Sequence, residues 1–163
     1  MCLVLTSLKL AFELNRRLIK LILFEMSKPK TIAVDFDGTI VEHRYPTIGK
    51  ELPFAIETLK LLQKKGHRLI LWSYRAGDEL EQAVEFCRMR GIEFYAVNKN
   101  YPEEKLGPGI SRKILADIYI DDRNLGGLPG WTEILAALHP ELTSEHSFRK
   151  KRKGRLWTLW FSK

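Results

Sequence analysis

The 163-residue chain has few cysteines and no long hydrophobic run that is free of charge. Two cysteines, Cys2 and Cys87, are too few for a disulfide framework, which favours a reduced, cytoplasmic setting. Residues 2–24 are rich in leucine, but charged residues interrupt them too often for a membrane-spanning helix or the core of a signal peptide. No unit repeats at a fixed period. These absences leave a single domain that is long enough to bury a core.

The net charge of +7 is confined to the two ends of the chain. Residues 27–140 carry equal numbers of basic and acidic side chains, so the charge does not indicate the ligand of this middle part. We interpret residues 1–26 as an upstream extension, with an amphipathic helix on a membrane or on the domain as the alternative. Residues 141–163 form a tail with a basic run and two tryptophans. A solvated charge run is the first interpretation of this tail, and contact with a polyanion or an anionic membrane is the sharper one.

The middle part is organised around Thr31–Thr39, where an apolar run ends in Asp35, Asp37 and Gly38. The run has no polar side, which predicts a strand buried on both faces with Asp35 at its carboxyl end. Gly38 allows a sharp turn and a close approach of the backbone to a ligand. Two carboxylates this close repel one another unless a cation lies between them or one of them is protonated. A plain strand with a turn capped by Asp37 is the alternative.

Helices and strands are expected to alternate through the rest of the middle part. Helical spacing of apolar residues predicts helices at 51–65, between Ser73 and Gly91, and at 131–138. Further strands are predicted at 67–73, 92–97 and 115–120, with a loop or short hairpin at 40–50 and a polar loop at 98–112. This order predicts an α/β fold: a Rossmann-like three-layer α/β/α sandwich with a mainly parallel sheet.

Polar side chains follow three of the predicted strands at their carboxyl ends. They are Asp35 with Asp37, Ser73 with Arg75, and Asp121 with Asp122. Because the carboxyl ends of parallel strands lie along one edge of the sheet, we expect these side chains to gather there. Carboxylate oxygens suit Mg²⁺, which pairs readily with a substrate phosphate. Hydroxyl and cationic side chains beside such an ion suit a phosphoryl group.

The arrangement resembles the haloacid dehalogenase superfamily of phosphohydrolases across about residues 30–138. The first motif of that family, Asp-x-Asp-Gly-Thr, is matched by Asp35-Phe-Asp-Gly-Thr39. Its second motif, a Ser or Thr that closes the next strand, is matched by Ser73. Its fourth, an acidic pair that closes a later strand, is matched by Asp121 and Asp122. These three motifs in order, each at a strand end, make the resemblance specific.

The third motif, a lysine upstream of the last strand, is matched less well. Lys113 is our choice, with Lys105 and Lys99 as rivals. Many relatives carry a cap domain, but neither the segment after Thr39 nor the 98–112 loop is long enough to fold as one. The resemblance therefore implies an open, capless site. Substrate contacts are expected, by position, from Arg75, Asn98, Lys99 and Tyr101.

The resemblance implies a Mg²⁺-dependent phosphatase. Asp35 would attack phosphorus and form an aspartyl-phosphate, and Asp37 would act as general acid and then general base. Mg²⁺ would be held by Asp35, the main-chain carbonyl of Asp37, Asp121 and Asp122, the last directly or through water. The phosphoryl oxygens would be bound by Ser73, Lys113 and backbone N–H groups near Gly38. An acid two residues after the nucleophile is the phosphatase and mutase pattern and argues against carbon–halogen cleavage.

Several plainer interpretations stay open beside this one. Ser73 could cap the following helix, and Arg75 could be an ordinary surface residue. His43 and His67 are more often structural or exposed than ligands. Asp117, inside a predicted strand, has no assigned role.

Other functions also compete with the phosphatase. One is a phospho-accepting signalling module, although response-regulator receivers place their acidic pair on the first strand and the phosphorylated Asp on the third. Another is a catalytically idle binding protein. The partner of the phosphatase would be a phosphorylated substrate of unknown class, and an open site could be closed by a neighbouring subunit of a homo-oligomer.

Overall fold

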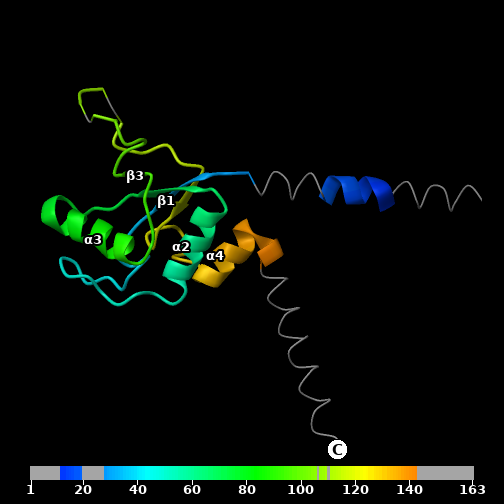
Figure 1. The fold of residues 1–163 in the computed structure, drawn as a ribbon, viewed down its shortest axis with the longest axis horizontal. Helices are drawn as coiled ribbons and strands as arrows, with labels where there is room; N and C mark the ends of the chain where they lie inside the picture. Colours follow the sequence, from blue (N-terminus) through cyan, green and yellow to red (C-terminus); the bar gives the residue numbers. More distant parts are fainter. Residues whose placement is uncertain (1–11, 20–27, 106, 110, 143–163) are drawn as a thin grey trace, which may run out of the picture.

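The computed structural model describes residues 12–19, 28–105, 107–109 and 111–142 (Figure 1). Residues 12–19 are helical with exposed side chains. The remainder of the 1–26 extension lies outside the described residues. So does nearly all of the 141–163 tail, together with the polyanion or membrane contact expected of it. Within the described part of the chain, no helix is long and apolar enough to cross a membrane.

Four parallel strands form one sheet in the order β3-β2-β1-β4. The strands are β1 (Thr31–Val34), β2 (Arg68–Leu71), β3 (Ala96–Val97) and β4 (Ile118–Ile120). The central strand, β1, pairs with β2 through Ala33 opposite Ile70 and with β4 through Ala33 opposite Tyr119. The helices between and after the strands are α2 (Ala55–Lys64), α3 (Gly77–Met89) and α4 (Trp131–Leu138). The predicted α/β, Rossmann-like parallel sheet is therefore confirmed.

The strand expected at 67–73 is shortened to Arg68–Leu71, and two further strands are shorter than predicted because of local packing. The strand expected at 92–97 has only two paired residues, because the Ile92 N–H donates to the Cys87 carbonyl and so completes the end of α3. The strand expected at 115–120 begins at Ile118. Before it, Leu115 is 84% exposed and the chain is held by the hydroxyl of Tyr119, which donates to the Ile114 carbonyl.

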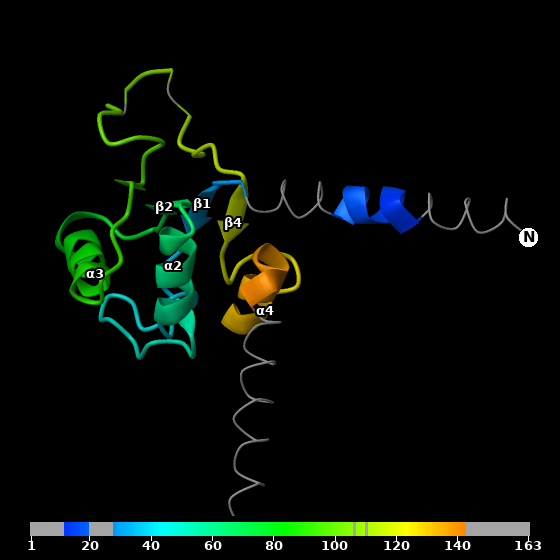
Figure 2. The same cartoon turned by 45° about the vertical axis from the view of Figure 1, so that its right-hand side comes forward.

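The three helices share one face of the sheet, which differs from the expected sandwich. Alternate strand residues such as Ile32, Val34 and Leu71 belong to the core that α2, α3 and α4 cover. The intervening residues Ala33 and Ile70 face the other way and belong to a smaller core. That core is closed by residues of the β3–β4 connection, which include Ile114 and Ala116. Among the described residues, the third layer is thus this connection rather than a second layer of helices. Figure 2 shows α3, α2 and α4 in a row beside the strands.

The segment after β1 folds back as a short hairpin, as predicted for residues 40–50. The Glu42 N–H donates to the Lys50 carbonyl at 2.7 Å, and the Leu52 N–H donates to the Ile40 carbonyl at 2.9 Å. The cap domain that many members of the haloacid dehalogenase superfamily carry is not seen in the described ranges. The carboxyl edge of the sheet is bordered instead by this hairpin, which leads directly into α2 (Figure 1).

Two polar residues outside that edge have structural roles. Asp117, which had no assigned role, accepts the Thr31 N–H through Oδ2 at 2.8 Å and ties the start of β1 to the start of β4. His67 is buried, and its Nδ1 accepts the Lys30 N–H at 3.0 Å. The structural interpretation of His67 is therefore confirmed.

Candidate functional site

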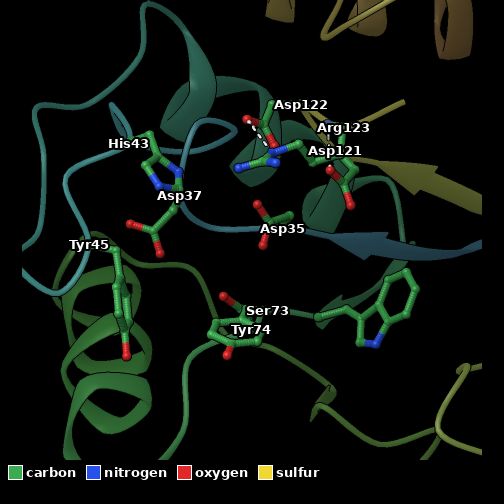
Figure 3. A pocket seen from close by; sticks show the side chains of 10 residues that line it. Asp35, Asp37, His43, Tyr45, Ser73, Tyr74, Asp121, Asp122 and Arg123 are labelled. Atoms are coloured by element: carbon green, nitrogen blue, oxygen red, sulfur yellow. Dashed lines mark hydrogen bonds and ion pairs between the residues drawn. The ribbon is translucent and has the colours of Figure 1, made fainter. Parts of the chain in front are cut away.

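A cavity of about 600 Å³ lies at the carboxyl edge of the sheet (Figure 3). It is lined by Asp35, Asp37, His43, Tyr45, Trp72, Ser73, Tyr74, Asp121, Asp122 and Arg123. These residues come from the ends of β1, β2 and β4 and from the hairpin after β1. The gathering of acidic and hydroxyl groups that the strand ends predict is thus seen in the structure.

Three carboxylates form the polar centre of this cavity. Asp35, Asp121 and Asp122 each offer an oxygen, and these oxygens all lie within 4.8 Å of one another. The backbone holds them in place: the Asp35 N–H donates to the Ile120 carbonyl at 3.0 Å, which joins the ends of β1 and β4. The Asp122 N–H donates to Oγ1 of Thr39 at 3.0 Å. Two neighbouring strands therefore bring their acids together by direct hydrogen bonds.

The cluster is electrostatically costly without a counter-ion. The pKa of Asp35 is raised from 3.8 to about 6, chiefly by burial and then by the negative charges of Asp121, Asp122 and Asp37. The Phe36 backbone N–H opposes this shift by donating to the carboxylate. Burial and like charge both disfavour the ionised form, and a cation reverses both effects. A set of carboxylate oxygens at this spacing fits Mg²⁺, a hard cation that takes oxygen ligands.

Gly38 is required by the geometry of the acidic cluster. Its φ is +84°, in the left-handed region that favours glycine. A Cβ atom at this position would overlap the carboxylate of Asp122. The turn after β1 and the position of Asp122 therefore depend on the same missing side chain.

Asp37 belongs to the cavity but not to the acidic cluster, because Arg75 binds its carboxylate. Arg75 Nε donates to Oδ2 of Asp37 at 2.6 Å, and Nη2 donates to Oδ1 at 2.8 Å. The same guanidinium donates to the carbonyls of Pro46 and Thr47, each at 2.9 Å. A two-pronged contact of this kind fixes both the position and the orientation of a carboxylate. The expected metal contact of Asp37 is through its main-chain carbonyl, and this stays a prediction.

The expectation that Arg75 contacts substrate is wrong in this structure. Arg75 is only 1% exposed, and its guanidinium carbon lies 5.0 Å from the ring centroid of Phe36 and 5.3 Å from that of Tyr45. The alternative that it is an ordinary surface residue is wrong for the same reason. Arg75 was predicted to contact substrate because it follows the end of a strand. That position brings it beside Asp37 but does not say which way the side chain turns.

Ser73 lines the cavity just after β2, and its side chain points toward the acidic cluster (Figure 3). Its Oγ accepts the Arg75 N–H at 3.4 Å. The helix that follows begins after Ala76, with no side-chain cap, so Ser73 is not the cap of α3. Its hydroxyl is placed where it can meet a ligand of the cavity.

Asn98, another expected substrate contact, instead holds the backbone of this turn. Its Oδ1 accepts the Ser73 N–H at 2.8 Å, and its Nδ2 donates to the Arg75 carbonyl at 3.4 Å. Asn98 does not line the cavity. We therefore correct its assignment from substrate contact to positioning residue for Ser73.

The lysines expected at the site lie elsewhere. Lys113 is exposed, with Nζ 5.7 Å from the centroid of the Tyr119 ring. Lys99 lies near the carboxylate of Glu104, and Lys105 is exposed. None of the three, and not Tyr101 either, is among the residues that line the cavity. The structure thus does not bring the expected phosphate-binding lysine, or the expected contacts Lys99 and Tyr101, to the site.

Two other basic side chains line the cavity: Arg123, which the sequence did not single out, and His43, which was interpreted as structural or exposed rather than as a ligand. Arg123 follows the acidic pair directly, and its Nε lies 3.6 Å from Oδ2 of Asp122. His43 comes from the hairpin and is exposed at the cavity. The position of Arg123 beside the last motif was a usable signal, whereas no motif marked His43 as a residue of the cavity.

Comparison with known proteins finds a close relative among solved structures. A conserved protein from Bacteroides thetaiotaomicron is 62% identical to this chain, with a TM-score of 0.66. The match covers 70% of this chain and 93% of the other. The chain belongs to the family of that conserved protein. No family model and no curated protein matches the chain. Membership in the Bacteroides protein's family shows the fold over the matched part.

Proposed function

We propose that this protein is a Mg²⁺-dependent phosphatase that hydrolyses a phosphate monoester through an aspartyl-phosphate on Asp35. The observation that carries the proposal is the cluster of Asp35, Asp121 and Asp122, whose oxygens lie within 4.8 Å of one another at the carboxyl edge of a parallel sheet. Ligands of open α/β sheets bind at this edge. The resemblance to the haloacid dehalogenase superfamily supports the same reaction.

Asp35 is the nucleophile in this proposal. One of its oxygens attacks phosphorus as the ester P–O bond breaks, which leaves the phosphoryl group on the Asp35 carboxylate. Water then attacks phosphorus, and inorganic phosphate and free Asp35 are released. Asp35, Asp121 and Asp122 would hold Mg²⁺ together with the main-chain carbonyl of Asp37. When bound, the ion supplies positive charge that offsets the repulsion between the phosphate and these carboxylates.

Asp37 is the group that moves protons in both steps. It gives a proton to the leaving oxygen and later takes one from the attacking water. Arg75 occupies one acceptor direction on each Asp37 oxygen, and a carboxylate has about four such directions. The remaining directions stay available to substrate and water.

The phosphoryl oxygens have donors within the same cavity. Ser73 supplies a hydroxyl, and Arg123 and His43 supply cationic or neutral N–H groups. Arg123 in particular offers the planar set of donors that phosphate binding favours. It takes the place, in this proposal, of the lysine that the family resemblance implied.

Hydrolysis of 4-nitrophenyl phosphate with and without Mg²⁺ tests the proposal. Asp35→Asn is expected to lower the rate by about a thousandfold or more, because it removes the nucleophile. Asp37→Asn is expected to lower it by about a hundredfold, as for loss of a general acid and base. Asp78→Asn, an exposed acid in the first turn of α3, is the matched control and should leave the rate unchanged.

Two results would overturn the assignment. Activity that survives in Asp35→Asn would remove Asp35 as nucleophile, and hydrolysis that does not depend on a divalent cation would remove the role of the acidic cluster. A stable phosphoprotein that does not turn over would favour the signalling module instead.

A further inference from the structure

Two tyrosine rings stand exposed at the same cavity as the acidic cluster. Tyr74 is 92% exposed and Tyr45 is 46% exposed, and both line the cavity that contains Asp35 (Figure 3). The two rings meet edge to face, with centroids 6.3 Å apart and planes at 74°. Large apolar surface left in water is unfavourable, and contiguous exposed patches often mark a binding site.

The backbone that carries Tyr74 is anchored on both sides. The preceding residue, Ser73, is held by Asn98, and the following residue, Arg75, is buried against Asp37. The Tyr74 ring is therefore an exposed side chain on a fixed base rather than part of a loose loop. Because the backbone is already fixed, little conformational entropy is lost when a ligand binds to this ring, and this small loss favours affinity.

Tyr45 is anchored in a similar way from the hairpin. Its ring lies 5.3 Å from the guanidinium carbon of Arg75, and the next residue, Pro46, accepts an Arg75 hydrogen bond. Trp72 also lines the cavity, and its ring is held by an edge contact with Tyr119 at 5.4 Å. Three aromatic side chains thus border a site whose chemistry is otherwise carried by carboxylates.

The cavity is larger than a phosphoryl group requires. Its volume of about 600 Å³ lies within the roughly 300–1,000 Å³ typical of small-molecule sites. The leaving group of the substrate therefore has room beside the phosphate. On the side of the two tyrosines, the space is bordered by π-surfaces, and planar rings stack on such surfaces.

We propose that the substrate is a phosphate monoester whose leaving group carries a planar aromatic ring, and that Tyr74 and Tyr45 receive this ring. This inference rests on the proposed phosphatase function, and it adds the substrate class. An aryl phosphate and a nucleoside monophosphate share the required chemistry and differ in the distance between ring and phosphorus.

The test compares kcat/KM for four esters: phenyl phosphate, adenosine 5′-monophosphate, ribose 5-phosphate and glycerol 3-phosphate. For each ester, the kcat/KM of Tyr74→Ala is divided by the kcat/KM of the parent protein, so that differences in leaving-group reactivity cancel. We expect a loss of about tenfold for at least one ring-bearing ester, the size of a lost stacking contact. The loss for the two esters without a ring should stay within about twofold. Whether phenyl phosphate or the nucleotide suffers more identifies the distance from ring to phosphorus.

Two control variants accompany the test. Tyr74→Phe keeps the ring and should behave like the parent protein. Tyr101→Ala removes a tyrosine that is exposed but does not line the cavity, and it should change none of the four rates. Because Tyr74 is 92% exposed, its loss is not expected to disturb folding.

Equal losses for all four esters, or no loss for any of them, would overturn the inference while leaving the phosphatase in place. So would a loss for ribose 5-phosphate as large as for the nucleotide, since a sugar would then be the group that Tyr74 contacts. If none of the esters is hydrolysed, the proposed function fails, and calorimetric binding to the Asp35→Asn variant decides the inference separately. Tighter binding of adenosine 5′-monophosphate than of ribose 5-phosphate, lost in Asp35→Asn with Tyr74→Ala, would support it, and equal binding would overturn it.

Discussion

The pairing of Asp37 with Arg75 shows how one buried side chain prepares a reactive one. Arg75 makes two hydrogen bonds to the Asp37 carboxylate and two to the hairpin carbonyls of Pro46 and Thr47. It therefore links the motif at the end of β1 to the hairpin that borders the site. Because Arg75 does not line the cavity, it acts on substrate only through Asp37.

Arg75→Lys tests this positioning role. A lysine keeps the positive charge but cannot bind both oxygens of Asp37 and both carbonyls at once. We expect kcat to fall by about ten- to a hundredfold with little change in KM, and the free energy of unfolding to fall by about 1–3 kcal/mol. Steady-state kinetics and urea denaturation measure the two effects. A rise in KM with unchanged kcat would show instead that Arg75 binds substrate.

The sequence could predict which residues meet at the site better than what each of them does. Strand-end position alone placed Asp35, Ser73 and Asp121 correctly, because parallel strands align their carboxyl ends. The direction of the Arg75 side chain depends on the hairpin carbonyls, which are distant in sequence. The location of Lys113 depends on the course of the β3–β4 connection, where Asn100 binds Glu104 and also accepts the Leu115 N–H.

At the scale of elements, the turn after β1 is the most demanding piece of backbone in the site. Gly38 joins β1 to the hairpin, and Asp122, at the end of β4, packs against its Cα. This turn therefore sets the distance between the carboxylates at the end of β1 and those at the end of β4.

Gly38→Ala is expected to weaken the site and the fold together. The left-handed φ costs a non-glycine residue about 1–2 kcal/mol, and the added methyl group displaces the Asp122 carboxylate. Thermal unfolding should show a lower Tm, and calorimetry should show weaker Mg²⁺ binding than for the parent protein. Gly109→Ala is the matched control, because that glycine has φ +83° but nothing near its Cβ position, so it should lower Tm without changing Mg²⁺ binding. Unchanged Mg²⁺ binding in Gly38→Ala would contradict this account of Asp122.

The start of β2 and the end of α4 are joined by a buried pair of histidines. His67 Nε2 lies 2.7 Å from His139 Nε2, and His139 Nδ1 lies 2.8 Å from Oε1 of Glu141, which also binds Lys65. Since His67 Nδ1 accepts the Lys30 N–H, its proton must be on Nε2, and His139 must accept it. An additional proton on His67 would be on Nδ1 and would point at the Lys30 N–H.

This pair predicts a loss of stability in mild acid. The pKa of His67 is lowered from 6.5, first by burial and then by His139, Lys30 and Lys65. Below about pH 6.5, His67 is protonated more readily in the unfolded chain than in the folded protein. The free energy of unfolding therefore falls as pH drops below that value. Urea denaturation at pH 7.5 and 5.5 measures the effect. The fall should be smaller in His67→Gln, and an equal fall in both proteins would refute the role of the pair.

The arrangement of helices was the part of the fold that the sequence predicted least well. Alternating helical and strand patterns predict an α/β sheet, and they do not specify which face each helix covers. Here α2, α3 and α4 share one face, and Ile114 with Ala116 closes the other. The connection between β3 and β4 therefore serves as core, although its polar composition predicted only a loop.

At the scale of the whole molecule, the acidic cluster sets stability as well as chemistry. The folded protein raises the pKa of Asp35 to about 6 from 3.8, so it binds a proton more tightly than the unfolded chain does. Above about pH 6 the ionised carboxylate therefore lowers the free energy of unfolding, and this cost disappears as pH falls toward 3.8.

Asp35→Asn is therefore expected to stabilise the metal-free protein at pH 7.5 by about 1 kcal/mol, a value reduced for the partial exposure of the carboxyl group. In the parent protein, Mg²⁺ should raise Tm, because it binds only the folded state. The variant should show little of this rise. Thermal unfolding with and without Mg²⁺ measures both, with Asp78→Asn as the control. A variant that is less stable without metal, or that gains as much from Mg²⁺ as the parent, would contradict the account.

Chemical trapping of the phosphorylated protein tests the central claim most directly. The protein is mixed with Mg²⁺ and excess 4-nitrophenyl phosphate, quenched in acid, and treated with borohydride, which reduces an acyl phosphate to an alcohol. Peptide mass spectrometry should then find the reduced side chain at Asp35, only when Mg²⁺ was present and never in Asp35→Asn. Mg²⁺-dependent hydrolysis with Asp35 unmodified, or modification at a different residue, would contradict the account.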